Sequence, residues 1–140
     1  MLVLEPRQLE AIERHMAEVL RSRLERVIAT TFPELGPAAG AQQVQAAPLG
    51  AIVQRGIESA AKYGIDEPRD LAAFIALGLA WRMLPRDTPI DWIRSWLERP
   101  DTEGSTKLAI IEAQLADAAP NPALSAMARR VADARRSLAA

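Results

Sequence analysis

The strongest constraint on the fold is an unbroken helical pattern over residues 6–31, which contain no glycine and no proline after Pro6. Apolar side chains recur there at steps of three and four residues, the spacing of one helix face: Leu9, Ile12, Met16, Leu20, Leu24, Val27 and Ile28. Such a helix is roughly 38 Å long, whereas a compact domain of this length has a radius of gyration of only about 14 Å. We therefore expect it either to span the whole domain or to project beyond it toward a partner.

The rest of the chain also favours helices. Alanine, leucine, arginine, glutamate and glutamine dominate, apolar and polar residues do not alternate strictly, and no Asn-Gly or Asp-Gly pair marks a hairpin. Helices are predicted over about 49–63, 67–84, 90–98, 105–118 and 122–138. Gly64 suits a helix stop, Asp66 suits an N-cap, and Asn121-Pro122 suits a cap followed by a first-turn proline.

These patterns predict an all-α fold, an irregular helical bundle of about six helices with a long N-terminal helix. Residues 1–140 are interpreted as a single helical domain, with 33–47 as a weakly structured connection that holds a short helix from about residue 41 onward. The helix over 67–84, which carries Leu71, Phe74, Ile75 and Leu79, is apolar on most sides and is expected at the centre. Gly78 within it is expected to let another helix approach closely.

Charge and composition exclude several function classes. Lys+Arg is 17 and Asp+Glu is 18, for a net charge of −1, so we expect no long-range attraction to nucleic acid or to a membrane. The chain has no cysteine and one histidine, which argues against disulfides and against zinc or iron–sulfur sites. No apolar run is long enough to cross a bilayer, and the start lacks a signal-peptide pattern, so a cytoplasmic location is expected.

No arrangement of residues typical of catalysis emerges. His15 has no acid or nucleophile beside it that would make it a general base. The carboxylates Asp66, Glu67 and Asp70 are explained as first-turn residues of a helix. A nucleophile elbow and a glycine-rich phosphate loop are both absent from the sequence. We therefore expect no catalytic residues, no cofactor and no metal, and a protein that is not an enzyme.

Tryptophan is the most informative residue type, because aromatic residues make up only 4% of the chain. Trp92 and Trp96 lie one turn apart on the predicted helix 90–98, together with Arg94 and nearby Arg99. Core packing explains the tryptophans in one interpretation. In the other, these four residues form a protein-binding surface, since tryptophan and arginine are enriched among interface hot spots.

Four arginines near the C-terminus offer a weaker candidate site: Arg129, Arg130, Arg135 and Arg136. They can contact phosphates, but Asp133 interrupts them and the rest of the chain balances their charge. A solvated helix face, or favourable charge at the C-terminal end of a helix, is the interpretation that we favour over a DNA-binding surface.

Several segments resemble short helical proteins encoded beside type VI secretion genes of Gram-negative bacteria. The matching segments are Leu4 to Leu9, Phe32-Pro33-Glu34, Tyr63-Gly64-Ile65, Asp70-Leu71-Ala72 with Phe74, and Trp92 through Leu97 to Pro100-Asp101. The resemblance covers most of residues 4–115. It departs after Leu79, where Trp81 to Pro85 replace a glycine-acidic-Phe turn, and it does not extend to the C-terminal helix.

The resemblance implies an accessory role, such as an adaptor or chaperone for a secreted toxin or spike component. A protein partner is therefore expected, and self-association through the long N-terminal helix is a further possibility. Two alternatives remain: an immunity protein that blocks a toxin, and a small DNA-binding regulator that uses the C-terminal arginines.

Overall fold

The computed structural model describes residues 5–35, 49–117 and 121–139, which form 6 α-helices and a turn of 3-10 helix. The helices are α1 (Pro6–Thr31), α3 (Leu49–Ala61), α4 (Pro68–Arg82), α5 (Asp91–Leu97), α6 (Gly104–Asp117) and α7 (Pro122–Ala139), and η1 (Pro33–Leu35) follows α1. These ranges contain no strand, so the predicted all-α bundle with a long first helix is confirmed.

Local signals place most helix ends where the sequence predicts them. Gly64 has a φ of 74°, and the N–H of Ile65 donates to the carbonyl of Ala60 at 3.0 Å, which closes the turn after α3. The Asn121 side chain accepts hydrogen bonds from the N–H groups of Ala123 and Leu124, at 3.0 and 3.2 Å, at the start of α7. The start of α4 differs by one residue, because Glu67 rather than Asp66 occupies the N-cap position.

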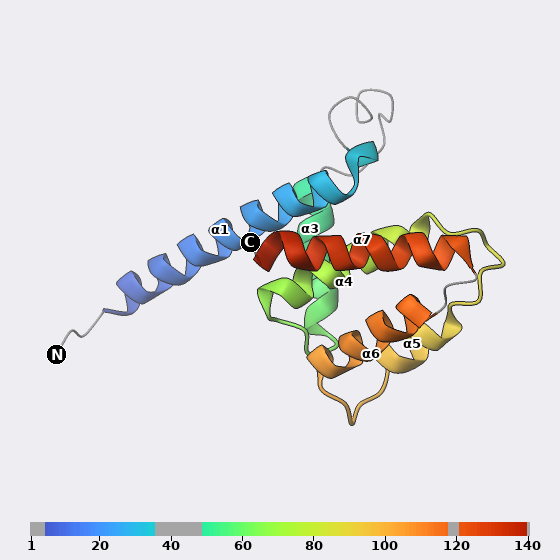
Figure 1. Cartoon of the computed structure of the whole chain (residues 1–140). Coiled ribbons are helices and arrows are strands. Elements are labelled where there is room, and N and C mark those ends of the chain that lie inside the picture. Colours follow the sequence, from blue (N-terminus) through green and yellow to red (C-terminus); the bar gives the residue numbers. More distant parts are fainter. Residues whose placement is uncertain (1–4, 36–48, 118–120, 140) are drawn as a thin grey trace.

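The predicted central position of α4 is confirmed. α7 lies along it in Figure 1, and α1 and α3 pack against its other sides. Most of its length is therefore buried, at Asp70, Leu71, Ala72, Ala73, Ile75, Ala76, Leu77 and Ala80. Phe74 and Leu79, which we expected at the centre, are only half-buried, because they lie on the side of α4 that no helix of the described chain covers completely.

Two glycines permit close packing, and a third does not act as predicted. A Cβ at Gly104 would lie 2.5 Å from the carbonyl oxygen of Gly64, so the start of α6 rests directly on the turn after α3. A Cβ at Gly56 would lie 2.5 Å from Cγ1 of Ile75, so α3 and α4 approach closely there. The prediction for Gly78 is wrong within this chain, because a Cβ there would meet nothing within 4 Å.

The long helix α1 projects beyond the body of the molecule. Its C-terminal half contributes Leu24, Val27 and Ile28 to the core, whereas every residue from 6 to 19 is exposed. Figure 1 shows this N-terminal half extending into solvent past the C-terminal end of α7. Of the two expectations for this helix, projection is therefore the one that the structure shows. We call residues 6–19 the arm.

The predicted weak connection lies mostly outside the described residues. Its first part is η1, and the short helix expected from about residue 41 falls within 36–48, which the structure does not describe. α3 begins at Leu49.

Candidate protein-binding surfaces

The predicted tryptophan pair lies on α5, a short helix whose inner face is anchored by buried Ile93 and Leu97. Trp92 and Trp96 are half-buried and pack against the core, and the Trp92 indole N–H donates to the carbonyl of Pro89 at 3.1 Å. Neither predicted role alone therefore describes them. Each ring contributes one part to the core and leaves another part at the surface.

The two arginines of this predicted surface are exposed and stack on different tryptophans. The Arg99 guanidinium carbon lies 4.0 Å from the centroid of the Trp96 ring, whereas that of Arg94 lies 5.8 Å from the Trp81 ring on α4. The structure therefore brings Arg99 and Trp96 together and directs Arg94 toward α4. The α5 face remains a candidate surface for a protein partner.

Two of the four arginines of α7, Arg130 and Arg135, are engaged within the molecule, which corrects the expectation of a solvated face for these two. Arg130 donates to both carboxylate oxygens of Glu34, at 2.9 and 2.6 Å, and its guanidinium carbon lies 4.6 Å from the Phe32 ring centroid. Arg136 pairs with Asp133 on its own helix. Arg129 is exposed and forms no ion pair with the described residues.

Arg135 connects three helices by donating to Asp70 on α4 at 2.7 Å and to Glu112 on α6 at 2.6 and 3.0 Å. Asp70 does lie in the first turn of α4, as predicted, but it is buried, so its main partner is Arg135 rather than solvent. Burial opposes the charge of Arg135, yet its hydrogen bonds to Glu112 and Asp70 outweigh this effect and raise its pKa. These contacts connect α4, α6 and α7.

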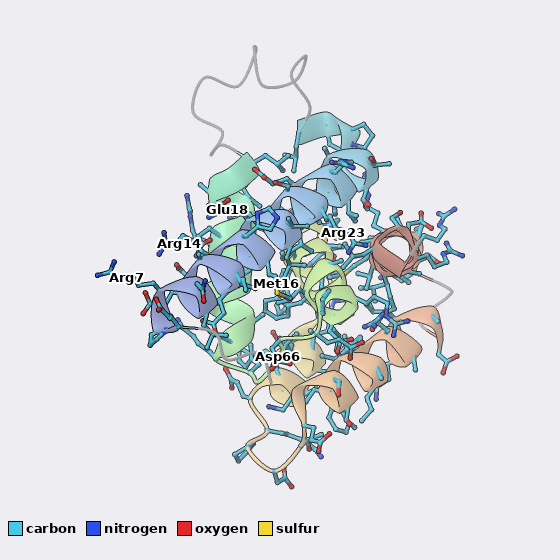
Figure 2. All side chains as sticks on the ribbon, turned by 90° about the vertical axis from the view of Figure 1, so that its left-hand side faces the viewer. Arg7, Arg14, Met16, Glu18, Arg23 and Asp66 are labelled. Atoms are coloured by element: carbon cyan, nitrogen blue, oxygen red, sulfur yellow. The ribbon has the colours of Figure 1, made fainter. Side chains whose placement is uncertain are left out.

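A surface that the sequence alone did not distinguish from core is the apolar side of the arm. Leu9, Ile12, Met16 and Val19 form it, with exposed fractions of 48%, 45%, 65% and 45%. We call these four residues the arm stripe. Figure 2 looks from the arm's end of the molecule and shows Met16 on the opposite side of α1 from Glu18. The charged and apolar sides of the arm are thus separated, and no helix of the described chain covers the apolar side.

A second surface, which the sequence analysis missed, is a groove of about 490 Å³ between α3 and α4. Its apolar lining consists of Ile52 and Gly56 on α3 and of Phe74, Ile75, Gly78 and Leu79 on α4. We call it the α3–α4 groove. The signal that pointed to it was a glycine inside each helix, because a glycine costs helix stability unless something uses the space that it leaves.

Charged residues surround this groove unevenly. Arg55, Lys62 and Arg82 line it together with one acid, Glu58. Among the described residues none of these three cations forms an ion pair, while Glu58 accepts a hydrogen bond from Gln54 at 3.1 Å. The groove is therefore apolar along its floor and mainly positive at its rim.

Two further observations concern the chemistry considered from the sequence. His15 is exposed on the arm, and no group of three or more metal-ligating side chains lies together among the described residues. In the same part of the chain no helix combines the length and the apolar character needed to cross a membrane.

Comparison with known proteins adds no relative from which a role can be transferred. No family model, no curated protein and no solved structure matches this chain.

Proposed function

We propose that this chain is a protein-binding accessory factor that acts by docking, with the arm stripe as its principal docking surface. The observation that carries the proposal is the exposure of four large apolar side chains along one side of a helix that leaves the body of the molecule. Isolated exposed apolar residues are common, but an aligned set on a projecting element is typical of an interaction site.

The arm is well suited to docking because it is a continuation of a helix that is already anchored. Leu24 and Ile28 are fully buried further along α1, so the orientation of the arm relative to the body is set before any partner arrives. An amphipathic helix of this kind binds an apolar groove through side chains spaced three and four residues apart. A preformed helix also loses less conformational entropy on binding than a chain that must fold first.

The resemblance to proteins encoded beside type VI secretion genes supports a more specific form of the proposal. In that form the partner is a secreted toxin or spike component, which the chain holds or presents as an adaptor or chaperone. The α5 face supports it too, because the stacked pair Trp96 and Arg99 belongs to the residue types that dominate interface hot spots. We do not extend the proposal to DNA, since Arg130, Arg135 and Arg136 are paired with acids.

The proposal is tested by binding measurements against the products of the genes adjacent to its own. Changing Ile12 and Met16 to glutamine retains helix propensity and removes the apolar contact. We expect this double variant to lose at least about tenfold in affinity for its partner, the loss typical of one or two interface anchors.

The matched control is Arg14→Gln with Glu18→Gln, which changes the arm outside the stripe and is expected to bind as the unchanged chain does. Equal binding by both double variants would show that the arm is not the docking surface. A crosslinker placed at Met16 and at Glu18 gives an independent measurement, because contact with a partner through the stripe requires crosslinks from Met16 alone.

A further inference from the structure

We propose that the α3–α4 groove receives the arm of a second copy of this chain. The inference rests on the proposed function in one respect, that the arm is a docking surface, and it names a partner for that surface. The described chain presents an uncovered apolar helix and an uncovered apolar groove. One intermolecular contact would cover both.

The arm stripe is long enough to cover the groove. It runs from Leu9 to Val19, which is about 15 Å or nearly three turns at 1.5 Å per residue. The α3 wall of the groove runs from Ile52 to Ser59, about 10 Å, and Lys62 follows just after α3 ends.

The charges are also complementary. Residues 5–19 carry four carboxylates, on Glu5, Glu10, Glu13 and Glu18, against two arginines. The arm with its N-cap therefore has a net negative charge. It would meet the positive rim formed by Arg55, Lys62 and Arg82.

Gly78 is the residue that argues most directly for an occupant. It lies in the middle of α4, where glycine lowers helix stability relative to alanine. Its backbone needs no left-handed conformation, and a Cβ there would meet nothing within 4 Å in this chain. Packing inside the monomer therefore does not require a glycine at this position, whereas close approach of a second helix along the groove does.

The arm cannot fill the groove of its own chain. Arg21 donates to Gln54 at 3.2 Å, which places α1 against one side of α3, and Ile52 and Ser59 in the groove lie on roughly the opposite side of that helix. Because α1 is unbroken, the arm cannot fold back around α3. The contact must be made between copies, and it leaves the α5 face available to a different protein.

The test is sedimentation velocity of the full chain over a range of concentrations, with one variant for each surface. We expect the unchanged chain to self-associate as its concentration rises. Ile12→Gln with Met16→Gln disables the arm, and Gly78→Leu fills the groove. Each should weaken self-association at least about tenfold.

Mixing the two variants gives the decisive measurement. A copy with an intact groove and a copy with an intact arm are expected to form a 1:1 complex at concentrations where neither variant alone associates. Arg82→Glu should weaken association, and it provides a second groove variant in case Gly78→Leu does not fold. Arg129→Glu is its control, because it makes the same change of charge at an exposed arginine outside the groove. Gly78→Ala should raise the thermal stability of the monomer and weaken self-association.

Three results would overturn the inference. A chain that stays monomeric at every concentration would overturn it, and the binding of the arm to a different protein would remain testable by the experiment above. Self-association that the arm variant abolishes and every groove variant retains would keep the arm as a docking surface and reject the groove. Failure of the two disabled variants to form a complex on mixing would reject the pairing of these two surfaces.

Discussion

The two halves of α1 have similar apolar spacing and opposite surroundings. Leu24 and Ile28 in the C-terminal half are fully buried, whereas Met16, two turns before Leu24, has 65% of its surface exposed. The helix itself continues through both halves without interruption. Apolar periodicity therefore predicts which side of a helix is apolar. Whether that side is buried within the same molecule depends on the other helices of the fold.

The largest expected effect comes from shortening one apolar side chain in each half. Leu24→Ala should lower the free energy of unfolding by about 2–5 kcal/mol, because it leaves a cavity in the core. Met16→Ala should change the stability of the monomer by less than about 0.5 kcal/mol, because its side chain is mostly in water. Urea unfolding at low protein concentration measures both, and similar losses in the two variants would show that the arm is packed in solution.

A smaller effect on stability is expected from the ion pairs of Arg135, which lie in the body of the molecule, away from the arm. Arg135→Met leaves Asp70 buried without its partner and should lower the free energy of unfolding by about 2 kcal/mol. Arg136→Met on the same helix is the control, since that pair is exposed and should contribute at most about 0.5 kcal/mol. If thermal unfolding gave equal losses for the two variants, Arg135 would not connect α4, α6 and α7 as described.

The same contrast between buried and exposed surroundings holds for two glycines: Gly56 packs against a neighbouring helix, whereas Gly78 does not. Gly78→Ala should raise the free energy of unfolding of the monomer by up to about 1 kcal/mol, because the added methyl group has room and helix propensity improves. Gly56→Ala should lower it, since its Cβ would lie 2.5 Å from the Ile75 side chain. Urea unfolding of the pair checks both signs, and stabilisation by Gly56→Ala would contradict the close approach of α3 and α4.

The smallest effect concerns acid stability just beyond the buried end of α1. Hydrogen bonds from Arg130 hold the pKa of Glu34 below its ordinary value of 4.5. The stabilisation from this pair is therefore present above pH 4.5 and is lost as the pH falls through the lowered pKa of the folded state. Glu34→Gln should remove less than about 1 kcal/mol at neutral pH, and it should flatten the stability profile below about pH 5. Thermal unfolding across this pH range tests it, and an unchanged slope would show that Glu34 does not contribute.

Local features were predictable from sequence because their causes are local. The spacing of apolar residues along 6–31, the stop at Gly64 and the cap at Asn121 each depend on neighbours within a few positions. The pairing of Asp70 with Arg135 was not predictable, because the two residues are far apart in sequence and meet only after α4 and α7 pack together. For the same reason Asp70 was interpreted as a first-turn residue and nothing more.

The candidate surfaces were harder to predict than the fold. Trp92, Trp96, Arg94 and Arg99 were identified by residue type, but their division between two stacking partners depends on where Trp81 lies on α4. Gly78 was predicted to let another helix approach closely, yet a Cβ there would meet nothing within 4 Å in this chain, because the helices that pack around α4 leave that position uncovered. The exposure of the arm stripe follows from the length of α1 relative to the helices it packs against, a property of the whole fold.

The absence of any break between the arm and the buried half of α1 has a mechanical consequence. A helix without glycine or proline after its first residue has no site at which to kink. A lateral force near the N-terminal end of the arm therefore rotates the whole helix. The force is transmitted to the C-terminal end of α1, where Arg130 contacts the Phe32 ring and donates to Glu34. A partner that fixes the orientation of the arm would therefore also fix the orientation of the rest of the domain.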